Sequence, residues 1–139
     1  MAKRKAPKQA TLDALFSQVI RERDDYTCRL CHKNYRHDTG MLDCAHNIGR
    51  RRGSVRWDTD NAFALCRPCH NDIDQRPLDH ADFIREELGE GRYETLKVKA
   101  RELMKMTDKD RKDLAAYMRE TLKILKARRA DGEVGRLDV

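Results

Sequence analysis

Residues 44–70 read CAHNIGRRRGSVRWDTDNAFALCRPCH, and this stretch decides the fold. It ends in a C-x-x-C pair, and a second pair with the sequence CRLC lies upstream. A C-x-x-C turn lets two thiolates reach one ion, and two such turns complete the tetrahedron that zinc prefers. We therefore expect a structural zinc ion bound by Cys28, Cys31, Cys66 and Cys69, with a hairpin within residues 32–65.

The cysteine pairs also admit a haem interpretation. His32 and His70 extend them to C-x-x-C-H, the pattern of covalent haem attachment. Haem attachment takes place outside the cytoplasm, whereas the basic N-terminus MAKRKAPK is not followed by the apolar segment of an export signal. We therefore favour zinc and expect a cytoplasmic protein, in which thiols stay reduced. The fifth cysteine, Cys44, is expected to be a small buried hydrophobic residue.

Length and charge limit the class of protein. A chain of 139 residues builds a modest core, so something besides apolar packing should help to stabilise it. The net charge of +6 favours a polyanionic partner such as DNA, although a merely soluble basic protein would show the same charge. No apolar run approaches the roughly 18 residues that a membrane span requires, so we expect no membrane contact.

The N-terminal half begins with an arm and a helix. Residues 1–10 are basic with almost no apolar side chains, which predicts a disordered arm. Thr11 is a typical N-cap residue, and a helical pattern of apolar side chains follows it. This pattern predicts one amphipathic helix from Leu12 to Arg23. Residues 24–78 lack a helical period and should form the loops and hairpin that carry the chemistry.

A helical pattern returns after residue 77 in three pieces. Their apolar positions are Phe83, Ile84 and Leu88; Tyr93, Leu96, Ala100, Leu103 and Met104; and Leu114, Tyr117, Met118, Thr121, Leu122 and Leu125. Thr107 and Asp110 are spaced as a capping pair that opens the last helix. We expect residues 79–139 to form a helical segment packed on residues 11–78, with a frayed tail around Gly132 and Gly135.

His46, Asn61 and His70 have a distinctive order and spacing. Together with the flanking RWDTDN and LCRPCH, they closely resemble the HNH endonuclease motif, above all that of phage-encoded members. More loosely, the chain is similar to recombination nucleases of the NinG/Rap kind. The resemblance covers roughly residues 26–76, with a weaker echo in LGEGRYETL at 88–96. It implies an α+β fold, a β hairpin followed by a helix around one metal ion, here with an N-terminal helix and C-terminal helices.

The resemblance also implies the roles of three residues. His46 would be the general base that activates water, and a neutral imidazole can accept a proton near pH 7. His70 would bind a catalytic divalent cation such as Mg²⁺, Mn²⁺ or Ni²⁺. Asn61 would hydrogen-bond across the hairpin loop and hold His46 in position. The ordinary alternatives are a structural histidine and an amide that caps a loop.

One position departs from the family pattern. Many members carry an Asp or His directly before the first His as a metal ligand, whereas this chain has Ala45. Asp43 is near in sequence, and Asp74 lies one helical turn after His70, so either carboxylate could complete the site. We favour Asp74. The alternatives are that both carboxylates are simply solvated, or that His46 itself binds the metal and another group is the base.

A cluster of arginines lies beside the proposed base. The guanidinium group suits phosphate oxygens, so these side chains are expected to contact the DNA backbone. They are Arg50, Arg51, Arg52 and Arg56. Trp57 could stack on a base, but a single Trp in a small domain more often belongs to the core.

Together these patterns predict a metal-dependent HNH endonuclease that hydrolyses DNA and is encoded by a phage or mobile element. Two alternatives remain open. A non-catalytic zinc module that binds nucleic acid would explain the cysteines and the charge, and a structure-specific nuclease would act on recombination junctions. Because a single HNH site nicks one strand, cleavage of both strands would indicate a homodimer.

Overall fold

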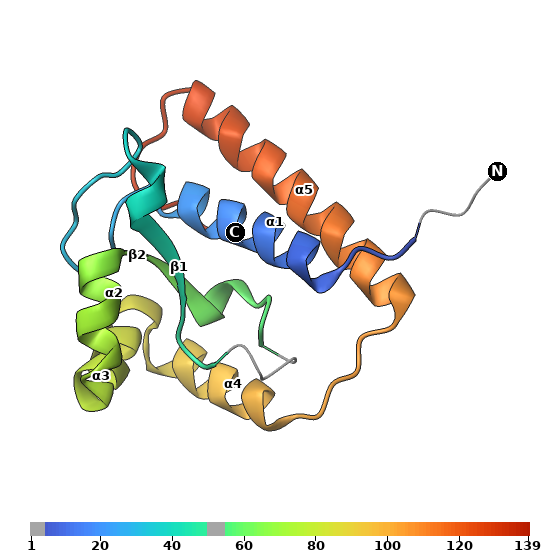
Figure 1. The fold of residues 1–139 in the computed structure, drawn as a ribbon, viewed down its shortest axis with the longest axis horizontal. Helices are drawn as coiled ribbons and strands as arrows, with labels where there is room; N and C mark the ends of the chain where they lie inside the picture. Colours follow the sequence, from blue (N-terminus) through green and yellow to red (C-terminus); the bar gives the residue numbers. More distant parts are fainter. Residues whose placement is uncertain (1–4, 50–54) are drawn as a thin grey trace.

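The computed structural model describes residues 5–49 and 55–139, and in these residues the fold is α+β. Five α-helices surround a two-stranded antiparallel sheet in the described ranges (Figure 1). The elements are α1 (Gln9–Arg23), β1 (Leu42–His46), β2 (Ala62–Cys66), α2 (Arg67–Asp74), α3 (Pro77–Leu88), α4 (Glu90–Arg101) and α5 (Asp108–Ala130), with short 3-10 turns η1 (Thr39–Met41) and η2 (Thr59–Asn61). None of these described helices is long and apolar enough to cross a membrane.

The hairpin of β1 and β2 lies between two groups of helices. Its register pairs Leu42 with Cys66 and His46 with Ala62. Every residue of β2 is buried, as expected for a strand that is covered on both faces. Helices α1 and α5 lie on one side of the hairpin, and α2, α3 and α4 lie on the other (Figure 1).

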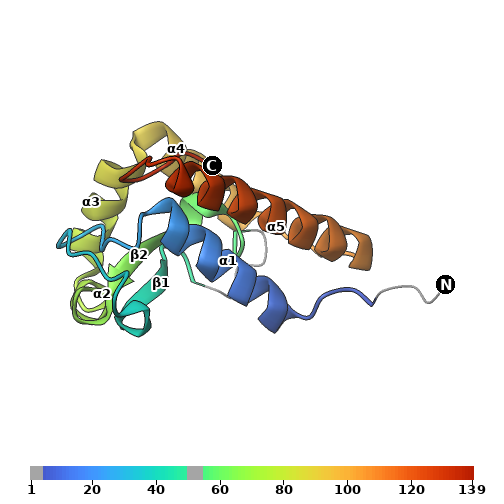
Figure 2. The same ribbon diagram turned by 90° about the horizontal axis from the view of Figure 1, so that it is seen from above.

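The first group consists of α1 and α5, which run side by side in the same direction (Figures 1 and 2). Their buried side chains form one cluster, which we call the terminal core: Leu12, Phe16, Val19, Ile20, Ala62, Ala115, Met118, Leu122, Leu125 and Leu137. The predicted capping pair of Thr107 and Asp110 is confirmed at the start of α5. The prediction that α1 begins after Thr11 is wrong, because the helix starts at Gln9 without a side-chain cap.

The second group packs α2, α3 and α4 against the hairpin. It forms the hairpin core: Cys28, Leu42, Ala45, Val55, Phe63, Ala64, Leu65, Cys66, Ile73, Phe83, Ile84, Leu88, Leu96 and Ala100. Helix α3 ends at Gly89, whose φ of 84° is easily adopted only by glycine. Leu103 and Met104 lie beyond the end of α4 and are exposed, so the prediction that they continue its apolar face is wrong.

The C-terminal tail packs on the protein, in contrast to the frayed end that its glycines predict. Leu137 is buried in the terminal core, and its N–H donates to the carbonyl of Arg23 over 2.9 Å. The Gly135 N–H donates to Asp25 Oδ2 over 2.8 Å. Because Gly132 and Gly135 both have positive φ, they turn the chain back onto the end of α1.

We expect Leu137→Ala to lower the free energy of unfolding by about 2 kcal/mol, because it removes a buried side chain from the terminal core. Urea denaturation followed by circular dichroism measures the change. Val134→Ala is the matched control, since Val134 is exposed in the same tail. Equal stability of the two variants would show that the docked tail adds nothing to the core.

Candidate functional site

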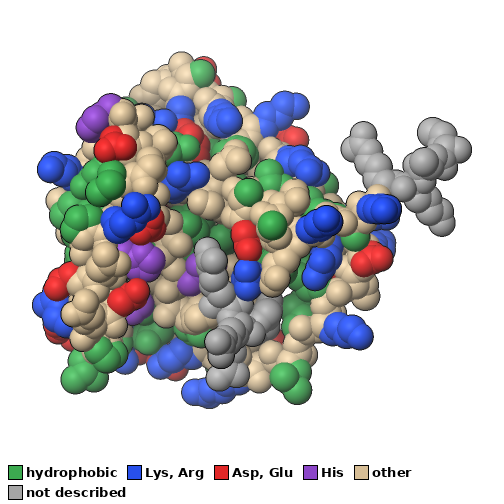
Figure 3. Space-filling model, in the orientation of Figure 1, with side chains coloured by type: hydrophobic (Ala, Val, Ile, Leu, Met, Phe, Trp, Pro, Cys, Tyr) green, Lys and Arg blue, Asp and Glu red, His purple; other side chains and the backbone are tan. Residues whose placement is uncertain are grey.

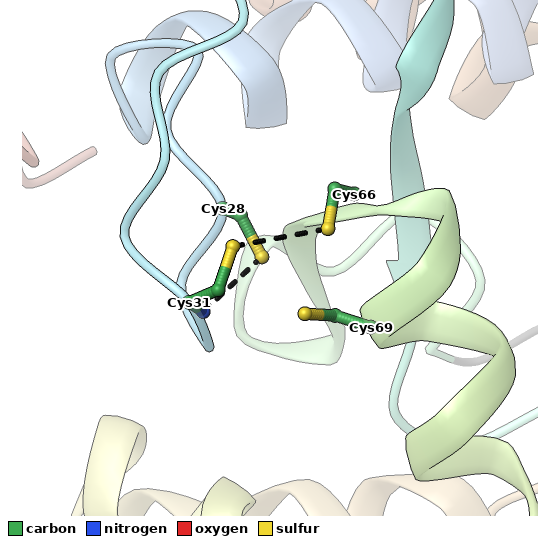
Figure 4. A group of neighbouring side chains, drawn as sticks. All are labelled: Cys28, Cys31, Cys66 and Cys69. Carbon is green, nitrogen blue, oxygen red and sulfur yellow. Dashed lines mark hydrogen bonds between the residues drawn. The ribbon is translucent and has the colours of Figure 1, made fainter.

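The two cysteine pairs meet at one point between the hairpin and its preceding loop. The sulfur atoms of Cys28, Cys31, Cys66 and Cys69 all lie within 4.8 Å of one another (Figure 4). The Sγ atoms of Cys31 and Cys66 are 3.8 Å apart. Four sulfurs around a zinc ion with Zn–S bonds of about 2.3 Å are roughly 3.8 Å apart, so the spacing fits tetrahedral zinc. This group could hold a structural metal such as zinc.

A tight turn positions the first pair. The Cys31 N–H points at Cys28 Sγ over 3.5 Å, and the His32 N–H donates to the Cys28 carbonyl over 2.8 Å. His32 has a φ of 64°, which closes the turn. The Arg29 N–H donates to the carbonyl of Ala64 over 2.9 Å, so the turn is fixed to β2.

The start of α2 positions the second pair. Cys66 is the N-cap of this helix and Cys69 lies in its first turn, where the helix dipole favours negative charge. Burial raises the pKa of Cys66, but the Cys69 N–H and the Tyr35 hydroxyl donate to its thiolate, and the result is a pKa lowered to about 7. Burial raises the pKa of Cys28. A bound metal ion would hold all four groups as thiolates.

A second polar cluster joins β1 to α2. His70 Nδ1 lies 3.1 Å from Asp43 Oδ2, and His70 Nε2 lies 3.5 Å from Asp74 Oδ2. Arg67 also contacts Asp43, at 3.2 Å. The two carboxylates therefore lie at opposite nitrogens of one imidazole ring. Within the described residues only the four cysteines bring three or more ligand atoms within 4.8 Å of one another, so Asp43, His70 and Asp74 form no such three-ligand group, and the pairing of His70 with Asp74 at a cation stays a prediction.

His46 lies on the other face of β1. Alternate residues of a strand point to opposite sides, so Asp43 and Ala45 face α2, while Cys44 and His46 face α1. The His46 ring lies 5.5 Å from the ring of Phe16 in α1, and its Nε2 lies 3.0 Å from the carbonyl oxygen of Arg56. Since a carbonyl only accepts, Nε2 is the donor in this contact.

Asn61 closes the loop that follows His46. It is fully buried at the junction of η2 and β2. Its Oδ1 accepts from the Ile48 N–H over 2.7 Å, and its Nδ2 donates to the carbonyls of Ile48 and Val55 over 2.9 and 3.0 Å. The hydrogen bonds across the hairpin loop that we expected of Asn61 are therefore present.

The arginine cluster is only partly described. Arg50, Arg51 and Arg52 lie outside the described residues. Arg56 forms an ion pair with Asp13 of α1, with an Nη2 to Oδ2 distance of 2.6 Å, and it is largely buried. Trp57 is half-buried against the terminal core and donates from Nε1 to the same carboxylate over 2.9 Å. Arg56 thus fastens the loop to α1, and its predicted contact with phosphate stays a prediction.

Sequence reasoning missed a buried ion pair that holds this region together. Arg23 and Asp24 at the end of α1 are 1% and 0% exposed and contact each other over 2.8 Å. Arg23 donates to the carbonyls of Thr59 and Ala62, which flank Asn61 on both sides. Asp24 accepts from the Ala64 N–H. No spacing rule links Arg23 and Asp24 to residues 59–64. The only signal in the sequence is a pair of charged residues at the end of an amphipathic helix.

Comparison with known proteins adds no family. No family model, curated protein or solved structure matches this chain.

Proposed function

We propose that this protein is a metal-dependent endonuclease of the HNH type that hydrolyses DNA phosphodiester bonds. The main support is Asn61, which ties both ends of the loop after His46 through three hydrogen bonds while fully buried. A buried amide with all of these bonds made fixes a loop without titrating. The HNH resemblance implies this role for Asn61, namely hydrogen bonds across the hairpin loop.

His46 is the general base in this proposal. It is the last residue of β1 and faces α1, whereas His70 lies on the α2 side, so the proposal requires the scissile phosphate to lie across this end of the hairpin, between the two residues. The orientation of the His46 ring is set by Phe16 on one side and by the Arg56 carbonyl at Nε2. Nε2 donates to that carbonyl, and in this proposal the imidazole ring accepts a proton from water, as an imidazole does near neutral pH. The ion pair between Arg56 and Asp13 keeps that carbonyl in place.

His70 and Asp74 are the residues that would hold the catalytic cation. The contact between Asp43 and Nδ1 orients the ring, which leaves Nε2 and the Asp74 carboxylate to bind the ion together. Asp43 is then a positioning residue and not a ligand. A divalent cation such as Mg²⁺, Mn²⁺ or Ni²⁺ would stabilise the charge that builds on the phosphate oxygens. Two protein ligands suffice for such ions when water and phosphate complete the shell.

Zinc at the four cysteines is structural in this proposal. All four coordination positions belong to thiolates, so no position is open for substrate. The metal would join the loop at residues 28–31 to the start of α2, which carries His70.

The test of the function is cleavage of supercoiled plasmid by the zinc-loaded protein, with and without added Mg²⁺, Mn²⁺ or Ni²⁺. We expect nicking only when a cation is added. Branched and linear duplexes, compared in parallel, separate a junction nuclease from a general nicking enzyme. If no DNA is cut under any of these metals while salt-sensitive binding persists, the protein is the non-catalytic zinc module and the proposal fails.

We expect Asp74→Asn to raise the Mn²⁺ concentration for half-maximal nicking by at least about tenfold, because it removes a charged ligand. A metal titration of the nicking rate measures this shift. Asp72→Asn is the matched control, since Asp72 lies on the same helix and pairs with Arg76. An equal shift in both variants would mean that only the general charge of α2 matters, and would remove Asp74 from the site.

A further inference from the structure

Helix α5 carries a row of cations on its outer side. Lys112, Arg119, Lys123 and Lys126 are each separated from the next by roughly one or two helical turns, so they share one face of the helix. We call these four residues the α5 basic stripe. All four are exposed, and none is within ion-pair or hydrogen-bond distance of any part of the chain that the structure describes.

The cations of the stripe have no carboxylate partner among the described residues, unlike two other cations of α5. Lys109 pairs with Asp113, and Arg128 pairs with Glu133. Asp108 and Glu120 border the stripe, but neither reaches one of its cations. Exposed cations without carboxylate partners keep their full attraction for an outside anion, since no internal ion pair has to be broken first.

A groove beside the stripe adds one more cation. It has a volume of about 390 Å³ between the start of α5 and the N-terminal segment. Its lining residues are Lys5, Pro7, Thr11, Lys112, Ala115, Ala116 and Arg119. The alanines and Thr11 are small, so the groove is bordered by the long side chains of three cations. Figure 3 shows Lys and Arg side chains following one another along this edge of the molecule.

We propose that the α5 basic stripe and Lys5 bind the sugar–phosphate backbone of duplex DNA, away from the scissile bond. The stripe is about 21 Å long, at 1.5 Å per helical residue. Each DNA strand has one phosphate per about 3.4 Å of duplex axis, so about 21 Å of duplex carries roughly six phosphates per strand, and the stripe would contact those on the near side. The stripe carries no aromatic side chain, which a platform for single strands would use to stack bases.

Because of the position of the stripe, bound DNA would extend beyond the candidate active site. Helix α5 packs on α1, and α1 packs on the hairpin that carries His46. The stripe therefore lies on the far side of α1 from the hairpin. This inference rests on the proposed function, since it takes DNA as the substrate, but it concerns binding and not hydrolysis.

The test measures binding of the zinc-loaded full chain to a fluorescent duplex of about 30 base pairs, without added divalent cation, by anisotropy between about 50 and 200 mM salt. The variant combines Lys112→Gln, Arg119→Gln and Lys123→Gln. We expect its affinity to fall at least about tenfold and its slope of log K against log salt to fall by about 2 to 3, at about 0.9 per lost phosphate contact. Glutamine is a good helix former, so α5 should stay intact.

The control variant loses three charges elsewhere, through Lys33→Gln, Arg76→Gln and Arg85→Gln. We expect it to keep the wild-type slope. Equal losses in both variants, a wild-type slope in the stripe variant, or competition by polyglutamate as strong as by unlabelled duplex would each overturn the inference. If the wild type cuts no DNA but only the stripe variant loses slope, the stripe stands and the nuclease proposal fails. If the wild type nicks plasmid and the stripe variant keeps its slope, the nuclease proposal stands and the DNA-binding role of the stripe fails.

Discussion

Replacing Cys28 by serine is expected to abolish stoichiometric zinc binding and cooperative unfolding of the chain. Cys28 is fully buried in the hairpin core, and its sulfur is one of the four that lie within 4.8 Å of one another. Zinc binding contributes about 10 to 16 kcal/mol in small zinc domains, which is comparable to the total stability of an ordinary domain, about 5 to 15 kcal/mol. Metal analysis of the purified protein and urea unfolding measure both effects.

Cys44→Ala is the matched control for this experiment. Cys44 lies on β1 but packs against the terminal core and takes no part in the four-cysteine cluster. We expect this variant to retain one zinc ion per chain and to unfold cooperatively. If Cys28→Ser also retains the metal and the wild-type urea midpoint, or if the wild type binds no metal, then the cluster is not a structural zinc site.

The second large effect is expected for His46→Ala, which should reduce metal-dependent nicking by about 10²- to 10⁴-fold, the usual contribution of a general base. DNA affinity and zinc content should stay close to wild type, because His46 is neither a thiolate ligand nor part of the α5 basic stripe. The nicking rate at saturating cation, measured beside DNA affinity, separates these effects. Retained cleavage would assign the base to another group.

His37→Ala is the control for His46→Ala. His37 is exposed in the loop before η1 and lies outside the proposed site. We expect it to nick plasmid at the wild-type rate. Thermal unfolding of both variants is also needed, since the His46 ring packs near Phe16 and its loss could loosen the terminal core. A His46→Ala protein that has lost its cooperative transition would not support the role of a base.

Local signals predicted the helices and the cysteine cluster because each depends on short spacings. The apolar period marked α1, α3, α4 and α5, and the capping pair of Thr107 and Asp110 marked the start of α5. The two C-x-x-C turns predicted the four sulfurs that converge. Boundaries were less certain, as the start of α1 at Gln9 and the end of α4 before Leu103 show.

Contacts between distant polar residues could not be predicted. Three features join segments far apart in the sequence: the hydrogen bonds of Arg23 and Asp24 to residues 59–64, the ion pair of Arg56 with Asp13, and the docking of Leu137. Whether a charged residue is solvated or buried depends on which chains close over it, and a single sequence does not contain that information.

The polar site was predicted in part. The spacing of His46 and Asn61 anticipated the hydrogen bonds of Asn61 across the loop. It did not anticipate that Asp43 and Asp74 lie at opposite nitrogens of His70. That arrangement depends on how α2 is rotated about its axis relative to β1. Tertiary packing sets this rotation, and the spacing of residues in the sequence does not reveal it.

The pairing of α1 with α5 has a consequence for the order in which the chain folds on the ribosome. The apolar face of α1 is covered by residues from Ala115 onward, so nearly the whole chain must be synthesised before the terminal core can close. The zinc cluster needs nothing beyond Cys69, and the hairpin core needs nothing beyond Ala100. Contacts between residues far apart in the sequence form late in folding. Until they form, the apolar surface that they will bury stays exposed and can aggregate. Nascent chains that stop before α5 should therefore depend on chaperones through α1, even after the metal has bound.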